Sequence, residues 1–355
     1  MHITEASHSS TLSRYFALCY SIVILIVSLY PFTGWRITGV PVLDFYTYPW
    51  PYYQTTFDNG INFLAYAPLG FAIAMNTRKR WLKILAALCW GLSLSSSIEF
   101  IQQFLPSRIA SNVDILSNTL GAFMGALLAM LIPWQSIQHS LRIRHMWLRS
   151  SQWVDMGTVW LGLWLLTQLD PAIPLFSLVN TVSDLPQPIK SPLANLTIFL
   201  TVLEASSVFL HGISVALFAS CLVRHRFAIA SIIWLTVALG FVCKMSMAIL
   251  MLRPVQFFTW LNLNVLLGGL AAIWALTLLL HLSSRTRALV GCATLLLSLI
   301  GSWIWPISPS FSATLSLFDW EYGHLSHFRA LTSTVRELWS YGALIILFGV
   351  ALRYR

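Results

Sequence analysis

The stretch from Ser97 to Gly125 reads SIEFIQQFLPSRIASNVDILSNTLGAFMG, and it decides how this part of the chain folds. Two apolar segments meet there at a short polar connection. Pro106 cannot continue a helix, so the first predicted helix ends just before it. The residues flanking the stretch are apolar enough to span a membrane, which takes about 20 residues per helix. The stretch therefore predicts two antiparallel membrane helices joined by a tight turn.

Polar side chains recur on one face of each of these two helices. Glu99 and Gln102 are three residues apart on the first helix, and Asp114 and Asn118 are four apart on the second. Residues at these spacings share a helix face. A carboxylate inside a membrane helix is costly, which makes it a functional-site hypothesis by default.

Structural roles compete with functional ones at these positions, and the sequence leaves the choice open. Glu99 suits an ion pair with Arg108 that holds the turn together. Asp114 suits a helix start of the form Ser111-x-x-Asp114, because the helix dipole favours an acidic residue in the first turn. Asn118 lies one turn deeper and has no capping role, so we expect it to hydrogen-bond across helices.

Composition places the whole chain in a membrane. Of its 355 residues, 57% are hydrophobic and only 9% are charged, whereas soluble domains are about 25% charged. We therefore predict an all-α polytopic membrane protein, a helical bundle of about ten transmembrane helices. The predicted spans are 15–32, 59–75, 81–105, 113–133, 153–169, 196–223, 227–252, 257–282, 288–306 and 335–352.

The distribution of basic residues predicts the orientation of these spans. Of the 21 lysine and arginine residues, fourteen fall on one side of the predicted membrane and six on the other, with Lys244 inside a span. Short cytoplasmic loops carry the excess of positive charge. Both termini are therefore predicted to be cytoplasmic, and the Glu99–Asp114 turn to face outward. The cytoplasmic set includes Arg149, Arg224, Arg226, Arg285 and Arg287.

Three separated motifs resemble the VanZ-like family, which is named after a teicoplanin-resistance protein. The first is Glu-x-x-Gln-x-x-x-Pro-x-Arg, and the second is Asp-x-x-x-Asn-x-x-Gly-x-x-x-Gly, both in the stretch quoted above. Upstream, Asn62 to Phe71 is similar to the second helix of the family, with Tyr66 where the family usually has Phe. The resemblance covers roughly residues 15 to 133. It implies a bacterial cell-envelope membrane protein and brings no established catalytic residues.

Six polar residues are predicted to converge into one outward-facing cleft. The short connection places the third and fourth spans side by side, with their outer ends at matching depth. Asn62 lies near the outer end of the second span and reaches the same level if that helix packs alongside. The candidate ligand-binding residues are Asn62, Glu99, Gln102, Arg108, Asp114 and Asn118. Gly121 and Gly125 are interpreted as a close-packing face.

The sequence also predicts a domain division and a buried ion pair. Residues 1–134 form a VanZ-like four-helix membrane domain, 135–152 a basic cytoplasmic linker, and 153–355 a second membrane domain of about six helices. Glu204 and Lys244 lie at equal depth on two consecutive spans. Because opposite charges in lipid are hard to tolerate separately, we expect them to pair, in a structural or a functional role.

Neither a cofactor nor a metal is expected. The five cysteines lie in apolar runs without metal-ligand spacing, and His324 and His327 are too loosely patterned for a metal site. The positive net charge follows from membrane topology, so nucleic acid is not an expected partner. Membrane lipids are expected partners, together with a lipid-linked envelope precursor or a glycopeptide. The sequence leaves the oligomeric state open.

The resemblance implies a cell-envelope role in the bacterial cytoplasmic (inner) membrane, in glycopeptide (teicoplanin) resistance or tolerance. A membrane-embedded enzyme acting on a lipid-linked precursor is one alternative, with Glu99 and Asp114 as acid or base. A lipid or solute transporter, or a flippase, is the other. The interpretation that we favour is not an enzyme, and no catalytic residue is assigned.

Overall fold

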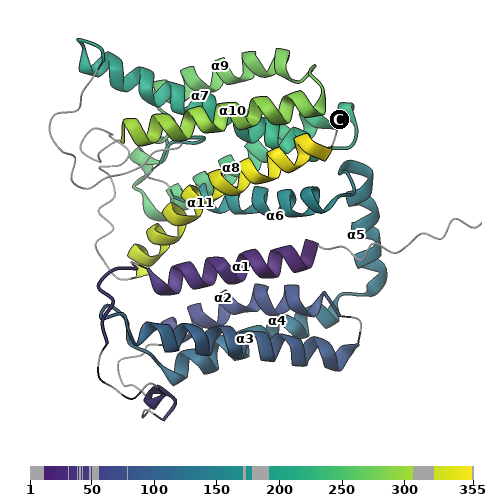
Figure 1. The fold of residues 1–355 in the computed structure, drawn as a ribbon, viewed down its shortest axis with the longest axis vertical. Helices are drawn as coiled ribbons and strands as arrows, with labels where there is room; N and C mark the ends of the chain where they lie inside the picture. The colour runs from purple at the N-terminus through teal and green to yellow at the C-terminus, as the bar shows by residue number, and fades with distance from the viewer. Residues whose placement is uncertain are drawn as a thin grey trace, which may run out of the picture. The chain divides into compact units, whose positions relative to one another are not determined.

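The computed structural model describes residues 12–30, 32–37, 39, 41, 43–47, 49, 56–77, 79–170, 173–177, 192–306 and 324–353. Helices account for nearly all the regular structure in these ranges, which contain no extended strand (Figure 1). The helices are α1 (Leu12–Leu29), η1 (Asp44–Tyr46), α2 (Thr56–Ala74), α3 (Arg80–Gln102), α4 (Asn112–Leu131), α5 (Trp134–Trp147), α6 (Gln152–Thr167), α7 (Leu196–Leu222), η2 (Arg226–Ala228), α8 (Ile229–Met251), η3 (Pro254–Gln256), α9 (Leu263–Leu279), α10 (Ser284–Ile304) and α11 (His324–Arg353).

The all-α membrane fold is confirmed. In the described ranges, seven helical segments are long and apolar enough to cross a membrane. They are α1, α3, α4, α7, α8 with the preceding η2, α10 and α11. Each of the ten predicted spans falls on a helix, and the three outside the set of seven correspond to α2, α6 and α9. α9 is apolar but has only 17 residues.

The chain divides into two compact units, residues 1–144 and 145–355. In the first unit, glycines bring α2 and α4 into backbone contact. A Cβ on Gly125 would lie 1.9 Å from the carbonyl oxygen of Ala67, and one on Gly70 would lie 1.9 Å from that of Ala122. Small residues spaced by four allow this approach, as in other membrane helix pairs. α3 packs on both α2 and α4, and α1 packs on α2 and α3.

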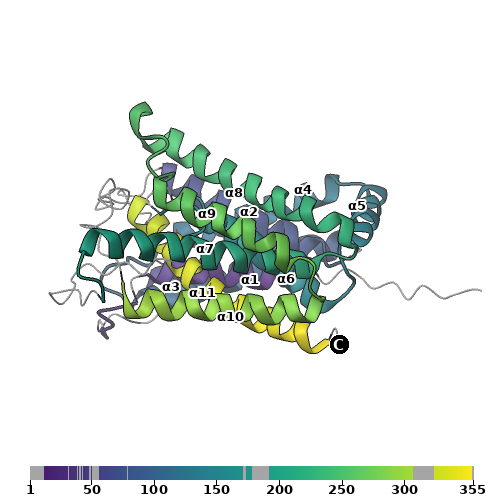
Figure 2. The same cartoon turned by 90° about the horizontal axis from the view of Figure 1, so that it is seen from above.

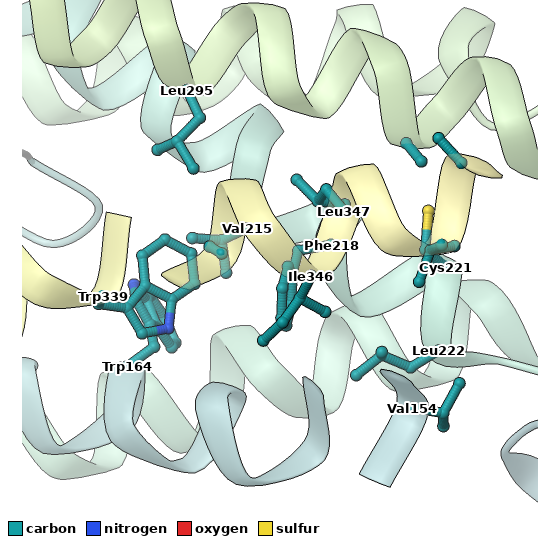
Figure 3. Close-up of a cluster of buried hydrophobic side chains, with 14 residues drawn as sticks. Val154, Trp164, Val215, Phe218, Cys221, Leu222, Leu295, Trp339, Ile346 and Leu347 are labelled. Atoms are coloured by element: carbon teal, nitrogen blue, oxygen red, sulfur yellow. The ribbon is translucent and has the colours of Figure 1, made fainter. Parts of the chain in front are cut away.

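The second unit is built around α7, which contacts α6, α8, α9, α10 and α11 (Figure 2). Its last ten residues, 213–222, are all buried. They contribute to an apolar core in which Trp164 and Trp339 lie at one end and Val154 and Cys221 at the other (Figure 3). The indole nitrogen of Trp339 donates to the carbonyl oxygen of Trp160 (2.8 Å), and that of Trp160 donates to the carbonyl oxygen of Trp339 (2.7 Å). These two reciprocal hydrogen bonds join α6 to α11.

Candidate functional site

A hydrogen bond between the start of α4 and the end of α3 stabilises the turn that connects these two helices. Ser111 is the N-cap of α4, and its hydroxyl accepts from the backbone N–H of Val113 (3.2 Å). The backbone N–H of Ser111 donates to Oε2 of Glu99 (2.8 Å). In a capping box this N–H is satisfied by an acidic residue three positions later on the same helix. Here Glu99 of α3 accepts that bond, while Asp114 occupies the first turn of α4, where the helix dipole favours it.

Gln102 and Arg108 stabilise the C-terminal end of α1. The amide nitrogen of Gln102 donates to the carbonyl oxygen of Ser28 (2.8 Å). The Nη2 atom of Arg108 donates to the carbonyl oxygens of Val27 and Tyr30, both at 3.1 Å. The last carbonyls of a helix lack partners within the helix, and a cation there also interacts favourably with the negative end of the helix dipole. Burial lowers the pKa of the Arg108 guanidinium from its usual value, and the nearby Glu99 opposes that shift.

Asn118 lies deeper in the bundle, in a buried polar group that spans α2, α3 and α4. Its Nδ2 donates to the hydroxyl of Ser95 (2.9 Å), whereas its Oδ1 is buried and has no hydrogen-bond partner among the residues that the structure describes. The Tyr66 hydroxyl faces Ser95 and is likewise buried, with no partner of hydrogen-bond geometry in the described ranges. Tyr66 also lies within electrostatic range of Glu99 and Asp114. We call the set Tyr66, Ser95, Glu99, Asp114 and Asn118 the elbow cluster.

The structure brings most, but not all, of the six predicted residues together. Glu99 interacts electrostatically with both Asp114 and Arg108, and Asn118 joins the same buried region through Ser95. Asn62 is half-buried on α2 and forms no hydrogen bond to the other five. Glu99 and Asn118 are buried, with only 3% and 6% of their surface exposed. Gln102 is also buried, whereas Arg108 and Asp114 are half-buried like Asn62.

Sequence reasoning missed Ser95 and treated Tyr66 only as a variation in a motif. Ser95 precedes Glu99 by four residues and therefore lies on the same face of α3. That spacing is a signal that could have identified it. Tyr66 carries no comparable signal, because its contribution depends on how α2 is rotated toward α3.

The predicted Glu204–Lys244 ion pair is not formed. Oε1 of Glu204 accepts from Nδ2 of Asn262 (2.8 Å), and Oε2 accepts from Nδ2 of Asn264 (2.7 Å). Lys244 is fully buried, and its Nζ donates to the carbonyl oxygens of Asp170 (2.5 Å) and Ile173 (2.8 Å). α7 and α8 do pack together, but Glu204 faces the start of α9 whereas Lys244 faces the segment after α6. Each charge therefore has its own polar partners.

Other buried polar groups lie near Lys244. The hydroxyl of Thr332 donates to Oδ2 of Asp170 (3.5 Å), and Arg336 interacts electrostatically with both Lys244 and His211. The His211 ring packs edge-on against Trp339. Within the described ranges, no group of three or more His, Cys, Asp or Glu side chains is placed to hold a metal.

The VanZ/LLP1 family model matches residues 4–133 of this chain. The resemblance predicted from the three motifs is thereby confirmed for the N-terminal part of the chain, and the match contains the whole elbow cluster. Searches of curated proteins and of solved structures returned no match.

Proposed function

We propose that the protein is a multi-pass protein of the bacterial cytoplasmic membrane, with both termini in the cytoplasm, that confers resistance to or tolerance of the glycopeptide teicoplanin. In this proposal the elbow cluster binds a polar group of an envelope component on the outer side of the membrane. The VanZ/LLP1 match over residues 4–133 supports the family context. The observation that carries the site is the unpartnered Oδ1 of Asn118.

A buried polar atom without a partner costs free energy, about 1–3 kcal/mol judged by mutational data. An apolar residue at position 118 would avoid that cost in a membrane bundle. Oδ1 of Asn118 can accept a hydrogen bond from an N–H or O–H group, while its Nδ2 is held in place by Ser95. A lipid-linked envelope precursor or a glycopeptide carries many such groups. Binding of one of them at the elbow cluster would satisfy the unpartnered oxygen.

The geometry favours binding over catalysis. A general acid or base must reach the reacting atoms of its substrate. Oε2 of Glu99 already accepts the backbone N–H of Ser111. One oxygen of this carboxylate therefore positions the helix start, and no observation specifically favours an enzyme or a transporter.

To test this proposal, the full chain is expressed in a teicoplanin-sensitive bacterium, and the susceptibility of that strain to teicoplanin is compared with that of two control strains. One control carries the empty vector, and the other expresses an unrelated membrane protein at an equal level. We expect a higher inhibitory concentration of teicoplanin only in the strain that expresses this chain. Equal susceptibility of all three strains, with the chain correctly inserted, would refute a resistance function.

A further inference from the structure

Three basic segments from different parts of the second unit meet at one end of α7. The backbone N–H of Arg149 donates to the carbonyl oxygen of Leu222 (3.0 Å), and its Nε donates to that of Val223 (2.9 Å). Nη1 of Arg149 donates to the hydroxyl of Ser284 (2.9 Å), the first residue of α10. The segment before α6, the end of α7 and the start of α10 are thus joined through one arginine.

Arg287 lies beside this junction, and two of its three guanidinium nitrogens have no acceptor among the described residues. Its side chain is 3% exposed, and its Nε and Nη1 atoms are buried without a hydrogen-bond partner. Among the titratable groups that act on it, the Cys221 thiol has the largest effect, followed by the like charges of Arg149 and Arg226. None of these is a carboxylate. A buried guanidinium near two other arginines and no carboxylate is costly unless an anion accompanies it.

The start of α10 adds further attraction for an anion. The Ser283 hydroxyl caps α10 by accepting from the backbone N–H of Thr286 (3.1 Å), and the first turn contains no acidic residue. The N-terminus of a helix carries partial positive charge and free N–H groups. Arg287 is in this first turn, so the helix and the arginines act on the same region.

We propose that Arg149, Arg226, Arg287 and the start of α10 bind the phosphate of an anionic lipid headgroup; we call these groups the basic junction. Guanidinium groups bind phosphate oxygens through paired, charge-assisted hydrogen bonds. The basic junction lies at the ends of two membrane-spanning helices, α7 and α10, which is the depth of lipid headgroups. All three arginines belong to the set that the charge distribution predicts to be cytoplasmic, and basic pockets between helices on that side suit anionic lipids. The proposal concerns the second unit and is independent of teicoplanin resistance.

The experiment titrates lipid into the purified, delipidated full chain in detergent and measures binding together with the thermal unfolding temperature. Phosphatidylglycerol is compared with zwitterionic phosphatidylcholine and with inorganic phosphate. Phosphatidylglycerol is expected to bind and to raise the unfolding temperature, and the other two to have little effect. Arg287→Gln is expected to weaken phosphatidylglycerol binding about tenfold or more, since it removes charge-assisted hydrogen bonds.

Two further variants keep the test decisive. Arg226 is exposed, so Arg226→Gln should fold normally and still weaken binding. Arg336→Gln removes another buried arginine of the same unit, outside the basic junction, and should leave lipid binding unchanged. Equal binding of phosphatidylglycerol by wild type and Arg226→Gln would overturn the proposal. Tight binding of inorganic phosphate without lipid binding would also overturn the assignment to a lipid.

Discussion

Substitution of Gly125 by alanine tests the close packing that places the elbow cluster. A Cβ at this position would lie 1.9 Å from the carbonyl oxygen of Ala67 and 2.7 Å from the backbone nitrogen of Phe71. Carbon and oxygen atoms in close contact across helices are about 3.3–3.6 Å apart, so α2 and α4 would have to separate by about 1 Å or more. Both clashing atoms are backbone atoms, which cannot rotate away.

The expected cost follows from this geometry. Overpacking of a well-packed interior typically costs about 1–3 kcal/mol, and a clash with backbone belongs at the upper end of that range. Alanine is the better helix former by about 1 kcal/mol, which offsets part of the cost. We therefore expect Gly125→Ala to lower the free energy of unfolding by about 1–2 kcal/mol net.

Gly60→Ala on α2 is the matched control, because a Cβ there would have no atom within 4 Å. This variant has the higher helix propensity of alanine without a clash, so its free energy of unfolding should be unchanged or slightly higher. Thermal unfolding of the purified variants in detergent, followed by fluorescence-detected gel filtration, measures the difference. If Gly125→Ala proved as stable as Gly60→Ala, the packing of α2 on α4 described above would be wrong.

The remaining predictions concern charge and topology. Because Glu204 and Lys244 have separate partners, Glu204→Leu and Lys244→Met should each destabilise the protein, and the losses should add within about 0.5 kcal/mol in the double variant. Thermal unfolding of the three variants measures this, and a double variant more stable than either single one would restore the direct ion pair. For topology, single cysteines at Lys79 and Ser107 can be probed with an impermeant thiol reagent in intact cells. The basic-residue distribution predicts protection at Lys79 and labelling at Ser107, and the reverse pattern would contradict it.

The features that were predicted correctly depend on residues close together in the sequence. Apolar runs located the helices, because burial in lipid depends on the composition of each segment. Ser111 was identified as a helix start from its own neighbours, and it is the N-cap of α4. Gly121 and Gly125 were interpreted as a packing face, and both contact the backbone of α2.

The features that were not predicted depend on how helices are rotated against one another. Glu204 bonds Asn264, which is 60 residues away, and Lys244 bonds a carbonyl that is 74 residues away. Equal depth along two helices does not determine which face each presents, so depth alone suggested the wrong pair. The same reason explains Tyr66, whose hydroxyl faces Ser95 only because α2 turns that side toward α3.

The most direct test of a functional elbow cluster separates teicoplanin susceptibility from the yield of folded protein. Glu99→Gln keeps an oxygen that can accept the Ser111 N–H, and Asn118→Leu removes the oxygen proposed to meet the ligand. Ser117→Ala is the matched control, because its hydroxyl only donates to the Val113 carbonyl of its own helix (2.9 Å). We expect loss of resistance at near-normal yield for Glu99→Gln and Asn118→Leu, and retention of both properties for Ser117→Ala. Unchanged resistance in the first two variants, or loss that only follows reduced yield, would assign the elbow cluster to the fold alone.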